Sequence, residues 1–332
     1  SLWRWTRTSG HDTREERIFS GQALGRFSAE RLSHIVNTCQ MEIERSEGQL
    51  ILLRTEQALQ QLLPTLEALK EQGIVCKTLS PEDARKQEPS LHVDTPFHAA
   101  LWLPGDLVAN CRQFALELKT ITQKMGVNYQ FGAEVQELGF QPQPSLTVAS
   151  SEGTKVVSAD HVVLCTGQAP QHLLVNHPLN IPMVALHGYG LSVALREPLN
   201  APRSAVHDMY EDLTITRLGN RIRVSAGAEL GPKRTIKDEK MVNTIYRALD
   251  RHFPGAANYP AGTQVWHGTR HAIVDGLPAI GQSGIPHLSL NIGHGACGWT
   301  WACGSARMLA DQISGRPSLL ATAPFLPTRF FS

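Results

Sequence analysis

Apolar residues along the chain recur with a helical period at several places. Spacings of three and four residues between apolar positions predict amphipathic helices, and these helices lie at Arg26–Arg45, Glu56–Gln72, Asn110–Met125, Lys237–Phe253 and from Trp299 onward. A short capped helical turn is predicted at Ser80–Pro89, because Ser80 is a favoured N-cap residue and Pro81 suits the first helical position.

Short apolar or alternating runs, which are typical of strands, lie between these helices and dominate after Met125. They occupy Gly48–Thr55, His98–Asp106, Asn128–Gly132, Ala133–Phe140, Ser145–Ser151, Thr154–Ala159, His161–Cys165, Met183–Leu195, Leu213–Arg217, Arg221–Ala226, Gln264–Gly268, Pro278–Gly281 and Leu288–Ile292. The stretch Asp212–Glu229 predicts a hairpin around Leu218-Gly219-Asn220. Because the central strands follow one another instead of alternating strictly with helices, the pattern predicts a mixed α+β or α/β fold.

Composition excludes several classes of protein. The chain has 332 residues, of which 42% are hydrophobic and 18% charged, and its net charge is +1, so nucleic acid is not an expected partner. Six cysteines without a CxxC pair suit neither a zinc site nor a small disulfide scaffold, and no cluster has metal-ligand spacing. No apolar run is long enough to span a bilayer and no signal peptide is recognisable, so we expect a cytoplasmic protein.

A glycine turn between a strand and a helix lies near the C-terminus, in NIGHGACGWTWACGSARMLADQISGR from Asn291 to Arg316. Gly293, Gly295 and Gly298 allow the backbone to turn sharply and a ligand to approach it closely. The N-terminus of the following helix presents free N–H groups, which suits an anion or an electron-rich heteroatom. By itself this turn is equally consistent with a tight connection that binds no ligand.

Two other segments add candidate chemistry. His161–Pro170 is a buried strand that ends in Cys165-Thr166-Gly167, and ligands of open α/β sheets gather at the carboxyl ends of strands. Trp266–Gly281 carries Arg270 two residues after Gly268, and a turn through Asp275-Gly276 follows.

Together these segments resemble the family of FAD-dependent D-amino acid oxidoreductases. The likeness is greatest to the bacterial D-amino acid dehydrogenases, and glycine oxidase is a more distant relative. It rests on Cys165-Thr166-Gly167, HGYGLS at His187–Ser192, Asp212–Glu229, GTRHAIVDGLPAIG at Gly268–Gly281, and Asn291–Arg316, with GQLILLRTEQ and LWLPGD matching early strands.

The resemblance implies a fold of two domains. Residues 1–47, 107–180 and 264–332 would form the remnant of an FAD-binding, Rossmann-like domain. Residues 48–106 and 181–263 would form a substrate domain with a large, mostly antiparallel sheet flanked by helices.

The resemblance also implies an FAD site and a substrate site. The flavin would lie at the glycine turn, with the Thr166-Gly167 turn on its other side and the adenosine half near Val135. Arg270 matches the arginine of the family that holds the substrate carboxylate, and Tyr189 and Tyr210 are candidate pocket residues. The expected cofactor residues are Val135, Thr166, Gly167, Gly293, His294, Gly295, Gly298 and Trp299.

Two departures from the family pattern stand out. Thr269 and His271 replace the usual Leu and Pro around the arginine, and His271 reads as a specificity residue or an exposed loop histidine. The G-x-G-x-x-G unit with which the family begins is not found, since Gly21–Gly25 has the wrong spacing and no preceding strand. Because that unit supplies the pyrophosphate-binding helix N-terminus of the family, we expect this chain to bind FAD poorly or to lack it. The first residue is Ser rather than Met, and we expect an N-terminally truncated chain.

Three explanations of this truncation stay open: a fragment, a gene whose product is completed by a second chain, or a protein that has lost flavin and kept its substrate domain. Exposed sheet edges would favour self-association.

The expected activity is oxidative deamination of D-amino acids to 2-oxo acids and ammonia, with hydride transfer to flavin and electrons passed to a quinone or another carrier. Peripheral association with the inner membrane stays open. The alternatives are a non-catalytic binding or assembly protein on the same scaffold, and an oxidase for glycine, sarcosine or hydroxyproline.

Overall fold

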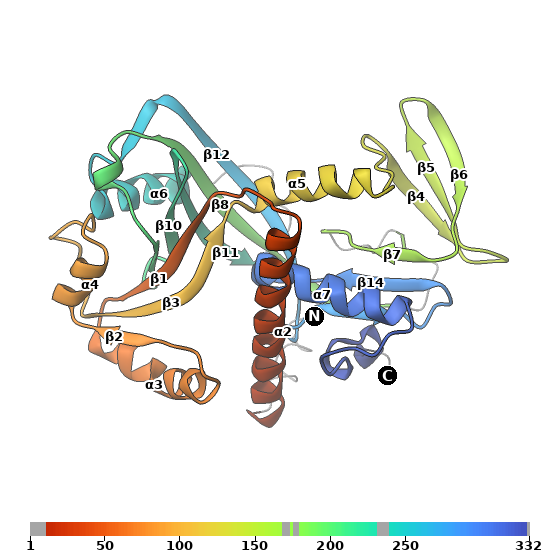
Figure 1. The fold of residues 1–332 in the computed structure, drawn as a ribbon, viewed down its shortest axis with the longest axis horizontal. Helices are drawn as coiled ribbons and strands as arrows, with labels where there is room; N and C mark the ends of the chain where they lie inside the picture. Colours follow the sequence, from red (N-terminus) through yellow and green to blue (C-terminus); the bar gives the residue numbers. More distant parts are fainter. Residues whose placement is uncertain (1–10, 168–172, 175–178, 231–238, 331–332) are drawn as a thin grey trace.

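The fold is given by a computed structural model, which describes residues 11–167, 173–174, 179–230 and 239–330. Helix α2 (His11–Thr38) runs through the middle of the molecule, as Figure 1 shows. The largest sheet lies on one side of α2, and two small sheets lie on the other side with helices α5 (Cys111–Lys124) and α7 (Gly298–Ile313).

The large sheet has eight strands in the order β12-β8-β11-β10-β9-β1-β3-β2. Its strands are β1 (Arg45–Leu53), β2 (Lys77–Leu79), β3 (Ala99–Ala109), β8 (Met183–Leu195), β9 (Ala205–Asp208), β10 (Leu213–Leu218), β11 (Arg221–Leu230) and β12 (Ala257–Ile273). All neighbours are antiparallel except β1 and β9, so the predicted large, mostly antiparallel sheet is confirmed.

One face of this sheet is the main hydrophobic core. Tyr189, Leu191 and Val193 of β8 pack there with Ile222 and Val224 of β11. Helix α6 (Glu239–His252) covers this face with Ile245, Ala248 and Leu249, while α3 (Glu56–Glu71) and α4 (Pro81–Gln87) lie near the other end of the sheet, as Figure 1 shows. The opposite face carries more polar residues and glycines, which leaves it available for a site.

The small sheets have three strands each. In one, β7 (Val162–Leu164) runs parallel to β14 (Leu288–Ile292), which pairs antiparallel with β13 (Ala279–Gln282). The other is an antiparallel meander of β4 (Glu134–Gly139), β5 (Ser145–Ser150) and β6 (Gly153–Ser158).

Helices α2 and α7 pack closely along their lengths. Trp301 Nε1 donates to the Gly21 carbonyl at 2.9 Å, and the Gly304 N–H donates to Ser28 Oγ at 3.1 Å. A Cβ at Gly304 would lie 3.1 Å from the Leu24 carbonyl oxygen, so a larger residue would push the helices apart. This packing holds the N-terminal end of α7, which follows the glycine turn, in a fixed place.

Most predicted elements form where the pattern places them, and Ser80 caps α4 by accepting from the Asp83 N–H at 3.1 Å. Three predictions are wrong in extent or type. The first helix ends at Thr38, since Gln40 takes a positive φ of 50° and Arg45 already begins β1. The strand predicted at 264–268 is part of the much longer β12, which pairs with β8 along most of its length.

The third wrong prediction is the strand at 128–132, which is irregular. Gly126 and Gly132 take positive φ values of 97° and 69°, and the rings of Tyr129 and Phe131 stack on each other at 5.8 Å. The helix predicted from Lys237 is confirmed from Glu239 onward; its first two predicted positions, 237–238, lie outside the described residues.

Candidate active site

Three segments meet where the parallel strands β7 and β14 end. Leu164 pairs with Leu290, so the turns that follow the two strands leave the sheet at the same edge. The end of β12 reaches this edge as well. His271 Nδ1 lies 3.3 Å from the Gly167 carbonyl oxygen, and Ala272 forms an isolated bridge with His294. His271 is therefore a strand residue that contacts one of the two turns, and the reading of it as a loop residue is wrong.

Glycine is required at two positions of the turn after β14. Gly293 and Gly295 have positive φ values of 79° and 55°. A Cβ at Gly293 would lie 2.4 Å from Ile273 Cγ1, and one at Gly295 would lie 2.8 Å from Ala272 Cβ. The backbone of the turn therefore packs directly against the end of β12.

The turn leads through a short 3-10 helix (Gly295–Cys297) into α7, whose first turn has no side-chain cap. Cys297, at the N-cap position, makes no capping hydrogen bond with its side chain. No side chain therefore caps the N–H groups at this end of α7, where the positive end of the helix dipole lies.

His294 is neutral at physiological pH, because burial lowers its pKa to about 4. Its Nε2 lies 3.0 Å from Ser305 Oγ, and the Ser305 hydroxyl is also placed to donate to the Ala302 carbonyl at 3.1 Å. A hydroxyl has one proton to donate, so His294 Nε2 carries the proton in this arrangement. The imidazole is thus held in one orientation without adding a charge to the site.

Arg270 lies on β12 on the same face as Ala272, the residue that touches Gly295, since alternate residues of a strand share a face. Its Nη2 donates to the Gly227 carbonyl at 3.0 Å, and its buried Nε makes no hydrogen bond within the described part of the chain. Burial raises the pKa of Cys297, and the positive charge of Arg270 opposes that shift. The guanidinium therefore lies within electrostatic reach of the start of α7.

The two candidate tyrosines lie in different surroundings. Tyr189 is 1% exposed and points to the core face of the sheet, with its ring 5.0 Å from that of His267, so it does not share a face with Arg270. Tyr210 is 74% exposed on the turn between β9 and β10. That turn reaches the site through its last residue, because the Asp212 carbonyl accepts from the Gly227 N–H at 3.4 Å.

The remaining candidate residues are spread around the glycine turn. Thr166 follows β7, and its buried Oγ1 has no partner in the described part of the chain. Trp299 lies in the first turn of α7, with its ring packed edge-on against Phe114 at 5.4 Å. Val135 belongs to β4 and packs against the cluster that contains Leu164 and Ile292. The structure thus places Thr166 beside the turn, and Val135 in the cluster that packs on the sheet of β7, β14 and β13.

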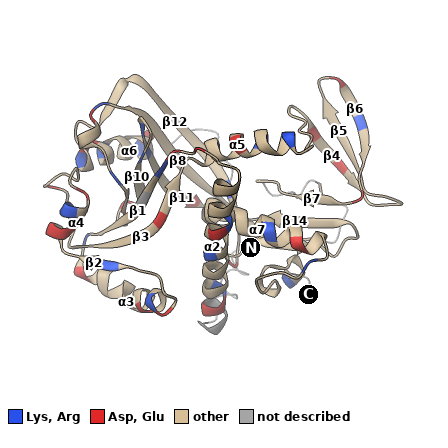
Figure 2. Ribbon diagram, in the orientation of Figure 1, with Lys and Arg blue, Asp and Glu red and all other residues tan. Residues whose placement is uncertain are grey.

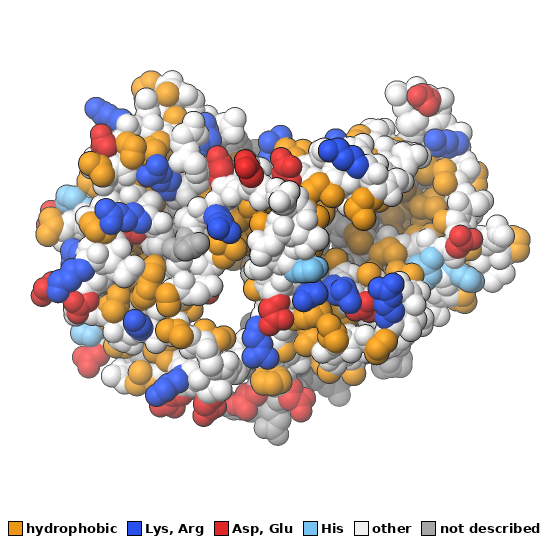
Figure 3. Space-filling view, viewed as in Figure 1, with side chains coloured by type: hydrophobic (Ala, Val, Ile, Leu, Met, Phe, Trp, Pro, Cys, Tyr) orange, Lys and Arg blue, Asp and Glu red, His pale blue; other side chains and the backbone are white. Residues whose placement is uncertain are grey.

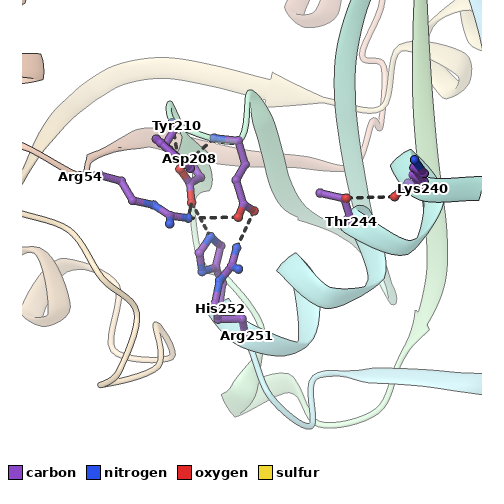
Figure 4. A network of polar contacts seen from close by, with 8 residues as sticks. Arg54, Asp208, Tyr210, Lys240, Thr244, Arg251 and His252 are labelled. Atoms are coloured by element: carbon purple, nitrogen blue, oxygen red, sulfur yellow. Dashed lines mark hydrogen bonds and ion pairs between the residues drawn. The ribbon is translucent and has the colours of Figure 1, made fainter. Parts of the chain in front are cut away.

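Sequence reasoning missed a buried ionic network that fastens the Tyr210 turn, shown in Figure 4. Asp208 accepts from Arg54 Nη2 at 2.6 Å and from His252 Nε2 at 3.0 Å, and its other oxygen accepts from the N–H groups of Tyr210 at 3.0 Å and Glu211 at 3.3 Å. Arg251 pairs with Glu211. No local motif predicts this network, because its members come from the residue after β1, from β9 and the turn that follows it, and from the end of α6.

A cavity of about 1110 Å³ opens beside the glycine turn, and Figure 3 shows the molecule hollowed between α2 and α3. Its walls are mostly apolar and come from α2, the loop at 73–75, the middle of β3, the turn at 275–277 and the first residues of α7. Asp106 of β3 lines it, and burial raises the pKa of this carboxyl group.

Charges of both signs are interspersed over the molecule, as Figure 2 shows, in keeping with the net charge of +1. Among the described residues, no three His, Cys, Asp or Glu side chains are grouped so that they could hold a metal ion. None of the described helices combines the length and the apolar character needed to cross a membrane.

Comparison with known proteins decides the family. The model of the FAD dependent oxidoreductase family (DAO) matches residues 3–312. The chain belongs to this family. D-amino acid dehydrogenase of Granulibacter bethesdensis is 34% identical over 277 residues, which cover 83% of this chain and 66% of that protein. The enzyme of the same name from Vibrio atlanticus is 32% identical over 297 residues, covering 89% of this chain and 70% of that protein.

Solved structures share the fold of this FAD-dependent oxidoreductase. Glycine oxidase from Geobacillus kaustophilus superposes with a TM-score of 0.80 at 19% identity, covering 95% of this chain and 84% of that one. L-proline dehydrogenase from P. horikoshii gives a TM-score of 0.80 at 17% identity, covering 94% and 83%.

The residues at the glycine turn fit the FAD on which the family depends. The uncapped start of α7 offers N–H donors, which suit the electron-rich heteroatoms of a flavin. Thr166 Oγ1 is a buried polar atom that lacks a partner among the described residues, which suits an atom that bonds to a ligand. Gly293 and Gly295 allow the positive φ of the turn and its packing against β12, which fixes the backbone in front of α7.

Proposed function

We propose that this FAD-dependent oxidoreductase oxidises D-amino acids to 2-imino acids, which water hydrolyses to 2-oxo acids and ammonia. The proposal is supported by relatives that are named D-amino acid dehydrogenase and are more than 30% identical. It also extends the activity of longer proteins to this chain, which spans 66–71% of their length. Electrons pass on to a quinone or another carrier.

The observation that carries the proposal is the guanidinium of Arg270 beside the glycine turn. One of its donors is bound to the Gly227 carbonyl, while the buried Nε lacks a partner among the described residues. A substrate carboxylate would satisfy Nε and a neighbouring Nη together, in the bidentate geometry that guanidinium favours. This grip would fix the orientation of the substrate Cα–H bond.

The other residues would hold the cofactor and close the site. Thr166, Gly167, Gly293, His294, Gly295, Gly298 and Trp299 would surround the flavin, with Val135 toward the adenosine half. FAD, when bound, supplies the acceptor for the two electrons of the Cα–H bond. The neutral His294 would contribute hydrogen bonding without a charge that competes with Arg270 for the carboxylate.

Tyr210 is proposed to line the substrate pocket, because its turn is hydrogen-bonded to Gly227, the residue that also binds Arg270. Tyr189 is assigned to the core under the sheet, because it is buried on the face opposite to Arg270. Tyr189 therefore does not line the pocket that contains Arg270.

The test compares Arg270→Ala with Arg217→Ala, a control on the β10–β11 hairpin of the same sheet, where Arg217 Nε donates to the Gly219 carbonyl at 3.2 Å. Protein supplied with FAD is mixed anaerobically with D-alanine or L-alanine while flavin absorbance is followed, and calorimetry measures D-alanine binding. Removing Arg270 is expected to cost about 2–5 kcal/mol of substrate binding. Only D-alanine should bleach the flavin in the wild type.

Arg270→Lys should restore part of the affinity, because an ammonium group keeps the charge but not the bidentate fork. If Arg270→Ala and Arg217→Ala bind D-alanine alike, Arg270 does not hold the carboxylate. A wild-type protein that binds FAD but neither binds nor oxidises any D-amino acid would contradict the proposed function itself.

A further inference from the structure

The sheet face that carries Arg270 also carries a strip of glycines and one large aromatic side chain. Trp266, Gly268 and Arg270 alternate along β12 and therefore point to the same side. On the neighbouring strand β8, Gly188 pairs with Gly268 and Gly190 pairs with Trp266. The core residues of both strands, such as Tyr189, occupy the opposite face.

Contacts show that the two large side chains lie over this strip. A Cβ at Gly190 would lie 2.1 Å from the Trp266 indole, and one at Gly188 would lie 2.8 Å from Arg270 Nη2. The indole therefore covers Gly190 and the guanidinium covers Gly188, two residues further along β8. Alternate residues of a strand are about 7 Å apart. The indole and the guanidinium are thus neighbours, and both lie over glycine positions of β8 that carry no side chain.

Trp266 is more exposed than we expect of a large aromatic side chain that packs on a sheet. It is 41% exposed, although its ring lies against Gly190 and comes within 3.7 Å of a Cβ placed at Gly268. One face of the indole rests on the sheet, so the exposed area belongs to the outer part of the ring. An apolar surface of this kind next to a carboxylate-binding guanidinium suits the side chain of an amino acid.

We propose that Trp266 forms the wall of the substrate pocket that receives the side chain, and that it selects D-amino acids with aromatic side chains. This inference rests on the proposed function, in which Arg270 holds the carboxylate. A substrate anchored there has its side chain directed either along the glycine strip or away from the sheet. Along the strip, an aromatic ring contacts the indole in the offset or edge-to-face geometry that aromatic pairs favour.

Arg223 adds a second element of selection. Its guanidinium lies 5.9 Å from the centre of the Trp266 ring, and it forms no ion pair with a carboxylate in the described part of the chain. Its uncompensated positive charge disfavours a substrate with a cationic side chain. D-lysine and D-arginine are therefore expected to be poor substrates, and neutral aromatic ones good.

The experiment measures kcat/KM and calorimetric affinity for D-phenylalanine, D-alanine, D-lysine and D-glutamate with the FAD-loaded protein. Trp266→Ala should lower the ratio of D-phenylalanine to D-alanine about tenfold, the order of one aromatic contact. Trp266→Phe should keep most of the ratio, because it retains a ring. Arg223→Gln should raise the D-lysine to D-alanine ratio. Trp102→Phe, a tryptophan of β3 that lies over Gly48, is the matched control and should leave every ratio unchanged.

Three outcomes would overturn the inference. In the first, Trp266→Ala and Trp266→Phe weaken D-phenylalanine and D-alanine by the same factor, which a purely structural role would produce. In the second, the wild type prefers D-glutamate and Arg223→Gln abolishes that preference, which gives the selection to Arg223. In the third, the wild type binds no D-amino acid at all. Only this last result also removes the proposed function, whereas in the first two the wild type still binds D-alanine and the role of Arg270 stands.

Discussion

Replacing Asp208 by Asn is expected to destabilise the protein strongly, because the carboxylate is the centre of the network in Figure 4. Asp208 is 1% exposed and accepts four hydrogen bonds, two of them from the side chains of Arg54 and His252. The Asn side chain can keep one oxygen for the backbone N–H groups. Its amide nitrogen then faces the donors of Arg54 and His252, and Arg54 keeps only its weaker contact with Glu211, whose Oε1 lies 3.3 Å from Nη2.

The size of the effect follows from removing one partner of a buried ion pair, which costs about 3–5 kcal/mol. For 332 residues that unfold together, the entropy of unfolding is about 0.7 kcal/mol per kelvin, so the melting temperature should fall by about 4–7 °C. Chemical denaturation followed by circular dichroism measures the free energy of unfolding, and calorimetry measures the melting temperature. Asp250→Asn is the control, since Asp250 is an exposed residue of α6 and its amide would still accept from Tyr259.

The pH dependence gives an independent check. Burial by itself raises the pKa of Asp208, but hydrogen bonds from His252 and Arg54 and their charges outweigh it, so the pKa lies well below the ordinary value. A depressed folded pKa means that the stabilisation is present above the unfolded pKa of about 4 and is lost as the pH falls below it. The difference between wild type and Asp208→Asn should therefore shrink below about pH 4. A difference under about 1 kcal/mol at pH 7 would refute the reasoning, as one buried pair broken on one side costs several times more.

Two further predictions concern the glycine turn. Burial lowers the pKa of His294 to about 4, below the value of about 6.5 of an unfolded histidine. As the pH falls, the unfolded state therefore takes up the proton first, and the free energy of unfolding of the wild type should fall by up to about 3 kcal/mol between pH 6.5 and 4. His294→Gln should flatten that part of the stability curve; a curve of unchanged slope would show that His294 does not titrate as buried. Gly295→Ala should cost about 1–3 kcal/mol, from its positive φ and the overlap with Ala272, and should weaken retention of FAD. Gly315→Ala is the control, because Gly315 has a φ of 65° but nothing within 4 Å of its added Cβ. If both variants lose the same free energy of unfolding, the overlap with Ala272 does not contribute to the loss at Gly295.

Local sequence signals predicted those elements well whose structure is decided by residues adjacent in the sequence. Ser80 and Pro81 define the start of α4, and the β10–β11 hairpin closes around Gly219 with its positive φ of 58°. The strand, glycine turn and helix near the C-terminus were also predicted from spacing alone. The strand predicted at 128–132 failed because a strand needs a partner, and no alternation of residues reveals whether one is present.

In the candidate site, too, some features follow from the sequence and others only from the tertiary structure. The sequence by itself determined the residue types that carry the chemistry: the guanidinium of Arg270, the small residues at 293–298 and the uncapped helix that follows them. Only the tertiary structure decided which of them meet. The parallel pairing of β7 with β14 brings the Thr166 turn to the glycine turn, and strand alternation turns Tyr189 into the core while it leaves Trp266 beside Arg270. Asp208 bonds to Arg54, 154 positions away, and such contacts depend on the packing of whole elements rather than on any local run of residues.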